Sequence, residues 1–171
     1  WQKQPRGTRT RGVRPAVFVN CIENHDQVAN SGDGARLPRK TTPGRFRALS
    51  TLFILMPGTP MIFQGQEFCS SRPFLYFADH KHELAMAVQK GRAEFVSQFP
   101  SLASAQMQAA LAAPHSRETF ERCKLDWTER QTNEATWRMY QDLLRLRRSD
   151  VAFRYQGGRG VDGSVLAAEA F

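Results

Sequence analysis

Long hydrophobic runs are missing from this sequence of 171 residues. No uninterrupted apolar stretch is longer than that of residues 52–56, which is far too short for a membrane-spanning helix of about 18 residues or more. The basic amino-terminal segment is not followed by the apolar region of a secretory signal. We therefore expect a cytoplasmic protein that has no membrane partner.

Cysteine is also scarce, and the three residues Cys21, Cys69 and Cys123 lie about 50 positions apart. An odd and widely spaced set argues against both a disulfide framework and a zinc cluster. We expect three reduced thiols, as in a cytosolic protein. The remaining composition, 41% apolar and 23% charged, is typical of a soluble globular domain.

Acidic residues are rare in the first quarter of the chain. Residues 1–47 hold ten Lys or Arg and three Asp or Glu, whereas residues 48–171 hold 14 and 13. The net charge of +8 therefore belongs mainly to a tail that contains Lys3, Arg6, Arg9, Arg11 and Arg14. Such a cluster can neutralise the phosphates of a nucleic acid, but no nucleic-acid-binding motif follows it. We expect a solvated loop and no nucleic-acid partner.

Two short apolar runs predict a pair of parallel strands. Residues 16–22 are rich in β-branched side chains and predict a buried strand, and residues 61–63 predict a second one. Between them, residues 43–56 predict a helix with Thr42 as its N-cap and Pro43 at its first position. A strand–helix–strand unit of this kind places both strands side by side in one parallel sheet. The expected buried face of the helix comprises Phe46, Leu49, Phe53 and Met56.

The later part of the chain predicts more helices and then a change of structure. Residues 83–99 and 134–148 both have helical patterns, and the second is clearly amphipathic. The glycine pair at residues 157–158 and the turn sequence at residues 162–163 indicate a β-hairpin after the last helix.

Polar residues follow both predicted strands, at residues 24–27 and 64–67. The carboxyl ends of parallel strands carry the functional residues in barrels and open sheets alike, so we expect a site there. Asp26 supplies a carboxylate, and Asn24 and His25 supply groups that bind hydroxyls. The alternative is a strand-end turn in which the Asn and Asp side chains bond the local backbone.

Two further segments leave alternatives open. Residues 74–77 read Phe-Leu-Tyr-Phe, which favours packing, with a platform for stacking sugars as the alternative. Asp79, His80 and His82 are possible metal ligands. No second pair of ligands accompanies them, so we expect a surface loop and no metal site.

Several blocks of the sequence resemble one enzyme family. Residues 23–27, Glu-Asn-His-Asp-Gln, resemble the fourth conserved segment of the α-amylase clan, glycoside hydrolase family 13. Other blocks agree in order and spacing, namely residues 58–67 (GTPMIFQGQE), 73–80 (PFLYFADH) and 124–127 (KLDW). With Gly34 and the pair Arg36-Leu37, they are most similar to the trehalose-releasing members, the malto-oligosyltrehalose trehalohydrolases.

This resemblance implies an α/β fold, the last part of a (β/α)8 TIM barrel that leads into an antiparallel β domain. Residues 1–150 would be the carboxyl-terminal portion of the catalytic barrel. Within it, residues 16–22 would be the seventh strand and residues 61–63 the eighth. Residues 151–171 would be the truncated start of the β domain.

The resemblance also assigns roles to single residues. It implies that Asp26 is the third catalytic carboxylate, which stabilises the transition state by binding sugar hydroxyls. The residues implied to bind or support the substrate are His25, Asn24, Gln27, Arg36 and Glu67. The implied substrate is a malto-oligosaccharide with a terminal trehalose, which the enzyme releases by cleaving the adjacent α-1,4-glucosidic bond. No cofactor is implied.

Two further carboxylates that such an enzyme needs are not recognisable in the sequence. Retaining glycosidases hold a nucleophile and a general acid about 5–5.5 Å apart, and in this family both belong to the fourth and fifth barrel strands. A full barrel also needs about 250 residues. The expected partner is therefore the missing amino-terminal barrel half of the same full-length chain, and the isolated chain is expected to be inactive.

Three other hypotheses stay open. The chain can belong to another enzyme of the clan that acts on α-glucans, such as an amylase or a branching enzyme. It can be a non-catalytic basic module that binds nucleic acid through the amino-terminal arginines. It can also be a folded but inert remnant of an enzyme.

Overall fold

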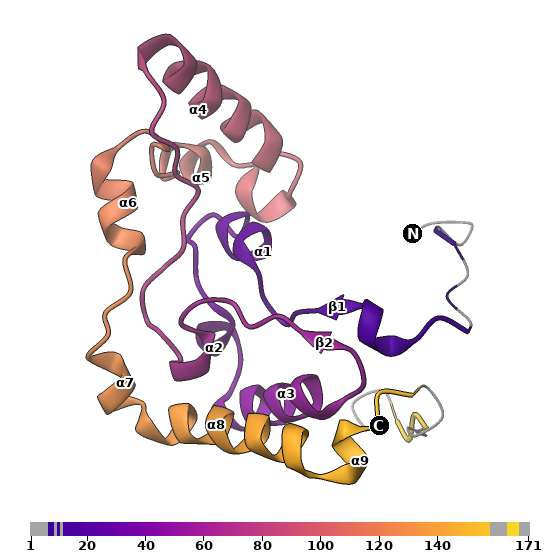
Figure 1. Cartoon of the computed structure of the whole chain (residues 1–171). Helices are drawn as coiled ribbons and strands as arrows, with labels where there is room; N and C mark the ends of the chain where they lie inside the picture. Colours follow the sequence, from indigo (N-terminus) through magenta and orange to yellow (C-terminus); the bar gives the residue numbers. More distant parts are fainter. Residues whose placement is uncertain (1–6, 9, 11, 158–163, 168–171) are drawn as a thin grey trace.

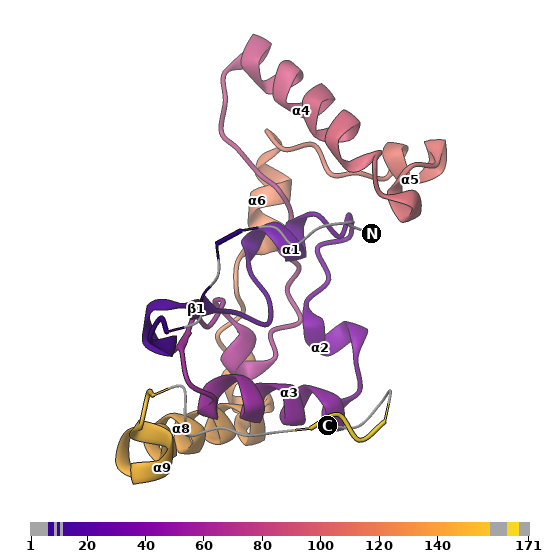
Figure 2. The same cartoon turned by 90° about the vertical axis from the view of Figure 1, so that its right-hand side faces the viewer.

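The computed structural model describes residues 7–8, 10, 12–157 and 164–167. Its short strands are β1 (Val19–Asn20) and β2 (Thr59–Pro60). Its α-helices are α1 (His25–Ala29), α2 (Leu37–Lys40), α3 (Pro43–Leu55), α4 (His82–Val96), α5 (Ala105–Ala109), α6 (Arg117–Cys123), α7 (Glu129–Thr132), α8 (Glu134–Ser149) and α9 (Val151–Arg154). Its 3-10 helices are Pro15–Val17, Gln66–Phe68 and Pro100–Leu102. The two longer helices predicted late in the chain are confirmed as α4 and α8. Figures 1 and 2 show α3 and α8 side by side at one end of the molecule and α4 at the other. No helix in the described residues is long and apolar enough to cross a lipid bilayer.

β1 and β2 form the parallel pair that the sequence predicts. Val19 pairs with Thr59, and Asn20 pairs with Pro60. The N–H of Met61 extends the ladder by donating to the carbonyl of Asn20 at 2.8 Å. Because α3 connects the two strands, the predicted strand–helix–strand unit is confirmed.

The first strand is shorter than predicted, and the second lies just before the predicted residues. Residues 15–17 form a 3-10 helix that the N–H of Phe18 closes on the carbonyl of Pro15 at 2.9 Å. Proline favours such a turn because its ring fixes φ near −65°. The second strand consists of Thr59–Pro60 and ends before residues 61–63. The predicted bounds are therefore wrong, and the assignment of the pair to a barrel stays a prediction.

α3 begins where the sequence predicts, with Pro43 as its first residue. The hydroxyl of Thr42 accepts a hydrogen bond from the N–H of Arg45 at 3.3 Å. This contact satisfies one of the backbone donors that a helix leaves open at its first turn. The predicted N-cap is therefore confirmed.

The buried face of α3 is rotated from the predicted one. Phe46 and Phe53 are buried as expected, but Leu49 is 39% exposed. Ser50 and Ile54 are fully buried in its place. The reason is that α8 packs on this side of α3, and the core cluster consists of Phe46, Phe53, Ile54, Tyr140 and Leu143.

A buried polar bridge fixes this packing. The hydroxyls of Ser50 in α3 and Tyr140 in α8 lie 2.9 Å apart, and the Nε2 amide of Gln66 donates to the Tyr140 hydroxyl at 2.8 Å. Burial raises the pKa of Tyr140, so its hydroxyl stays protonated. The bridge ties the segment that follows β2 to both helices of the core.

A short helix follows α8 directly. Val151–Arg154 form α9, and the carboxylate of Asp150 caps it by accepting from the N–H of Ala152 at 2.8 Å. This local cap continues the helical path from α8 to residue 154. The predicted turn at residues 162–163 lies outside the described residues. A domain boundary at residue 151 stays a prediction.

The exposed edge of β1 predicts self-association. The side chains of Val17, Phe18 and Val19 are exposed. An exposed apolar strand edge is a template for pairing with another chain. We expect light scattering to show dimers or larger species, and expect Val19→Lys to reduce them more than Val151→Lys on α9 does. A monodisperse monomer with a cooperative melt would contradict this prediction.

Candidate active site

Asn24 builds the turn that carries the predicted site. Its Oδ1 accepts from the N–H of Gln27 at 2.9 Å, which makes Asn24 the N-cap of α1. Its Nδ2 lies 3.6 Å from the Sγ of Cys21. Asn24 therefore holds the turn through local contacts, as the alternative interpretation of this residue expected.

Asp26 does not share that local role. Its side chain is 75% exposed, and its carboxylate lies 3.5 Å from the Nε2 of His25. In the part of the chain that the structure describes, no backbone N–H donates to the carboxylate of Asp26, unlike the side chain of Asn24. The carboxylate of Asp26 and the imidazole of His25 are therefore both available to a ligand.

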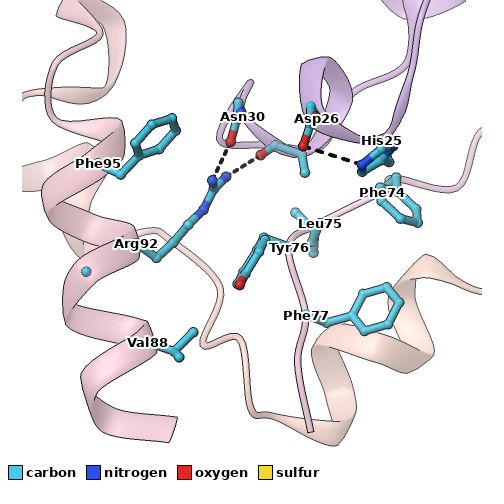
Figure 3. A pocket seen from close by; sticks show the side chains of 12 residues that line it. His25, Asp26, Asn30, Phe74, Leu75, Tyr76, Phe77, Val88, Arg92 and Phe95 are labelled. Carbon is cyan, nitrogen blue, oxygen red and sulfur yellow. Dashed lines mark hydrogen bonds and ion pairs between the residues drawn. The ribbon is translucent and has the colours of Figure 1, made fainter. Parts of the chain in front are cut away.

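His25 and Asp26 lie at a cleft of about 650 Å³ between α1, residues 74–77 and α4. Figure 3 shows Arg92 and Phe95 on α4, with Arg92 reaching toward Asn30, and Tyr76 projecting from the segment 74–77 toward Arg92. Gly91 also lines the cleft. Its missing side chain keeps the wall open beside Arg92.

Arg92 connects the two walls of the cleft. Its guanidinium donates to the carbonyl of Ala29 at 2.7 Å and to the side-chain oxygen of Asn30, and its Cζ lies 5.0 Å from the ring centre of Tyr76. Burial lowers the pKa of Arg92, while Tyr76 and Asp26 act in the opposite direction. Sequence reasoning did not name Arg92 as a site residue. The available signal was an arginine beside a glycine on a predicted helix.

The aromatic segment 74–77 has two faces. Phe74 and Phe77 belong to a row of rings in edge-to-face contact, with Phe63 5.1 Å from Phe74 and Phe120 5.2 Å from Phe77. Tyr76 points into the cleft and is exposed. Packing is thus confirmed for the two phenylalanines, and the tyrosine leaves a surface for stacking.

The other predicted site residues do not line the cleft. Gln27 is exposed on α1 but is not part of the cleft wall. Arg36 is 1% exposed and donates to the carbonyls of Gln64 and Arg72, both at 2.7 Å. Glu67 is half-buried. The structure thus brings His25 and Asp26 to the cleft, places Arg36 inside the protein and leaves Glu67 half-buried away from the cleft.

The possible metal ligands do not assemble. Within the described ranges, no three His, Cys, Asp or Glu side chains are grouped so that they could hold a metal ion. Asp79 and His80 are exposed residues between residues 74–77 and α4, and His82 begins α4. The three cysteines are free thiols.

Comparison with known proteins adds independent information. No family model matches the chain. Curated malto-oligosyltrehalose trehalohydrolases from Deinococcus radiodurans, Brevibacterium helvolum and Saccharolobus solfataricus are 38%, 35% and 33% identical to it, over 96%, 80% and 86% of its length. The chain is a homologue of malto-oligosyltrehalose trehalohydrolases.

These trehalohydrolases are much longer than the chain, which spans 28%, 23% and 24% of their respective lengths. A solved crystal structure from Salmonella typhimurium, described as an alpha amylase, superimposes with a TM-score of 0.76 at 35% identity. The match covers 86% of this chain and 24% of that one. The chain therefore has part of an amylase-type fold, and its homologues are glycoside hydrolases.

Proposed function

We propose that this chain is the carboxyl-terminal barrel portion of a glycoside hydrolase that releases trehalose from malto-oligosyltrehalose. The observation that carries the proposal is the carboxylate of Asp26, exposed at the cleft and not held by the backbone. The homology to trehalohydrolases supports the choice of reaction. The free cysteine thiols support a cytoplasmic location, which is part of the same proposal.

Asp26 acts as the transition-state stabiliser in this proposal. Cleavage of a glycosidic bond passes through a transition state with positive charge on the sugar ring. A carboxylate that binds two ring hydroxyls holds the distorted sugar more tightly than the relaxed one, so it lowers the barrier by differential binding. His25, 3.5 Å from this carboxylate, binds the same ring.

The cleft supplies the rest of the sugar contact. Tyr76 offers an aromatic surface for the apolar side of a glucose ring, and Phe95 extends that surface along α4. Arg92 and Asn30 offer polar groups beside it. Such a wall suits a neutral oligosaccharide, which presents both hydroxyls and C–H faces.

The nucleophile and the general acid come from the missing amino-terminal barrel half in this proposal. The isolated chain should therefore release no trehalose from malto-oligosyltrehalose. The measurement is product chromatography with the purified chain. Turnover that Asp26→Ala abolishes would refute the prediction and require a mechanism without those two carboxylates.

A second candidate is another hydrolase that acts on α-glucans. The Salmonella typhimurium neighbour described as an alpha amylase favours it. A chimera separates the two candidates, with this chain replacing the matching part of the Deinococcus radiodurans trehalohydrolase. We expect the chimera to release trehalose from malto-oligosyltrehalose and to cleave a malto-oligosaccharide of equal length poorly. Equal cleavage of both, with maltose and glucose as products, would favour the second candidate.

A further inference from the structure

A buried group of charged residues lies beneath the turn that carries Asp26. Glu23 directly precedes the N-cap Asn24, and Arg36 precedes α2. Glu67 belongs to the 3-10 helix that follows β2. Glu23 and Arg36 are 3% and 1% exposed. The loops that follow both strands therefore meet at these side chains.

Arg36 ties these loops together. Its Nη1 donates to the carbonyl of Gln64 and its Nε to the carbonyl of Arg72. The same Nη1 lies 3.8 Å from Oε1 of Glu23. The other carboxylate oxygen of Glu23 accepts from the N–H of Leu37 at 2.8 Å. A continuous set of contacts thus runs from the segment after β2, through the guanidinium, to the residue next to the Asn24 cap.

Three buried atoms of this group have no hydrogen-bond partner in the described residues: Oε1 of Glu23, Nη2 of Arg36 and Oε2 of Glu67. Buried polar atoms are normally satisfied, and leaving them open is costly. Burial raises the pKa of Glu23 and lowers that of Arg36, while Glu23 and Glu67 both favour the charged guanidinium. Apolar side chains of similar volume often stabilise a protein as well as a buried ion pair does. A gain in stability therefore does not explain why these charged residues occupy a buried position.

We infer that Glu23 and Arg36 are positioning residues that fix the orientation of the turn bearing Asp26. The negative charge of Glu67 helps to keep the guanidinium of Arg36 charged. The inference rests on the proposed function for its catalytic consequence. Arg36 and Glu67 then act through the turn and do not touch the sugar. A planar guanidinium with several donors suits this task, because it donates to two carbonyls in fixed directions while its charge lies 3.8 Å from the Glu23 carboxylate.

The test begins with hydrogen exchange in the 171-residue chain. Arg36→Lys removes the several N–H donors of the guanidinium and keeps the positive charge. The matched control is Arg39→Lys on the exposed side of α2. We expect Arg36→Lys to speed exchange at the amides of Val28 and Asn30, which α1 protects, by about tenfold. Exchange at Tyr140 in α8 should stay within about twofold, as should every amide in the control.

Glu23→Gln provides a second variant, because it keeps the shape and removes the charge. It should speed exchange in α1 like Arg36→Lys. Unchanged exchange in α1, or an equal rise in α1 and α8, would overturn the inference, because the second result describes general destabilisation. If Arg36→Lys does not fold, the result with Glu23→Gln decides.

Kinetics of the trehalohydrolase chimera test the catalytic consequence. We expect Arg36→Lys to lower kcat by about 10–100-fold with KM within about threefold, and Arg39→Lys to change neither. An unchanged kcat would contradict a positioning role. If Asp26→Asn also leaves kcat unchanged, the proposed function fails, while the exchange experiment still decides whether the buried group fixes the turn.

Discussion

Replacing Asp26 by Asn should lower kcat of the trehalohydrolase chimera by about 10²–10⁴-fold, or about 3–5 kcal/mol. This is the scale found when one preorganised electrostatic group is removed from an active site. Asn keeps the shape of the side chain but removes the charge that stabilises the developing cation. The loss should fall mainly on kcat, because the interaction is stronger in the transition state than in the ground state.

The measurement is steady-state kinetics on malto-oligosyltrehalose, with folding verified by circular dichroism. His25→Asn is the comparison, and it should cost less because a neutral hydrogen bond is weaker than a charged one. A kcat near that of the unmodified chimera, in a folded Asp26→Asn variant, would mean that Asp26 is a turn residue like Asn24.

Ile54→Ala should have the largest effect on stability. Ile54 is fully buried in the cluster between α3 and α8, so its truncation should lower the free energy of unfolding by about 2–5 kcal/mol. Leu49→Ala on the same helix removes similar volume at a position that is 39% exposed, and should cost less than about 1 kcal/mol. Urea denaturation of the chain, with equal m-values for both variants, measures the difference. The reverse order would show that the helix packs through the face the sequence pattern predicts.

Local chemistry made parts of this fold predictable. The caps formed by Thr42 and Asn24 depend on side-chain and backbone groups three residues apart, so the sequence itself contains the required information. The parallel pairing of the two strands follows from the helix that connects them. Because functional residues follow the carboxyl ends of parallel strands, the pairing also predicts a site at His25 and Asp26, which lie at the cleft.

Long-range packing decided what the sequence pattern left open. The spacing of apolar residues predicts that α3 is a helix. Which of its residues are buried depends on where α8 packs, and α8 covers Ile54 and leaves Leu49 exposed. The family resemblance implies that Arg36 binds or supports the substrate, whereas the carbonyl of Arg72, 36 positions away, holds it inside the protein. Arg92 reaches Asn30 across 62 positions, and no local pattern marks that contact.

The most direct test of the account is a crystal structure of the trehalohydrolase chimera with a sulfur-linked analogue of malto-oligosyltrehalose that resists cleavage. We expect the oligosaccharide to lie in the cleft between α1 and α4. We also expect the carboxylate of Asp26 to accept hydrogen bonds, about 2.6–3.2 Å long, from two hydroxyls of the ring at the cleaved bond. An oligosaccharide bound elsewhere, with the carboxylate of Asp26 turned toward the backbone of α1, would contradict the account.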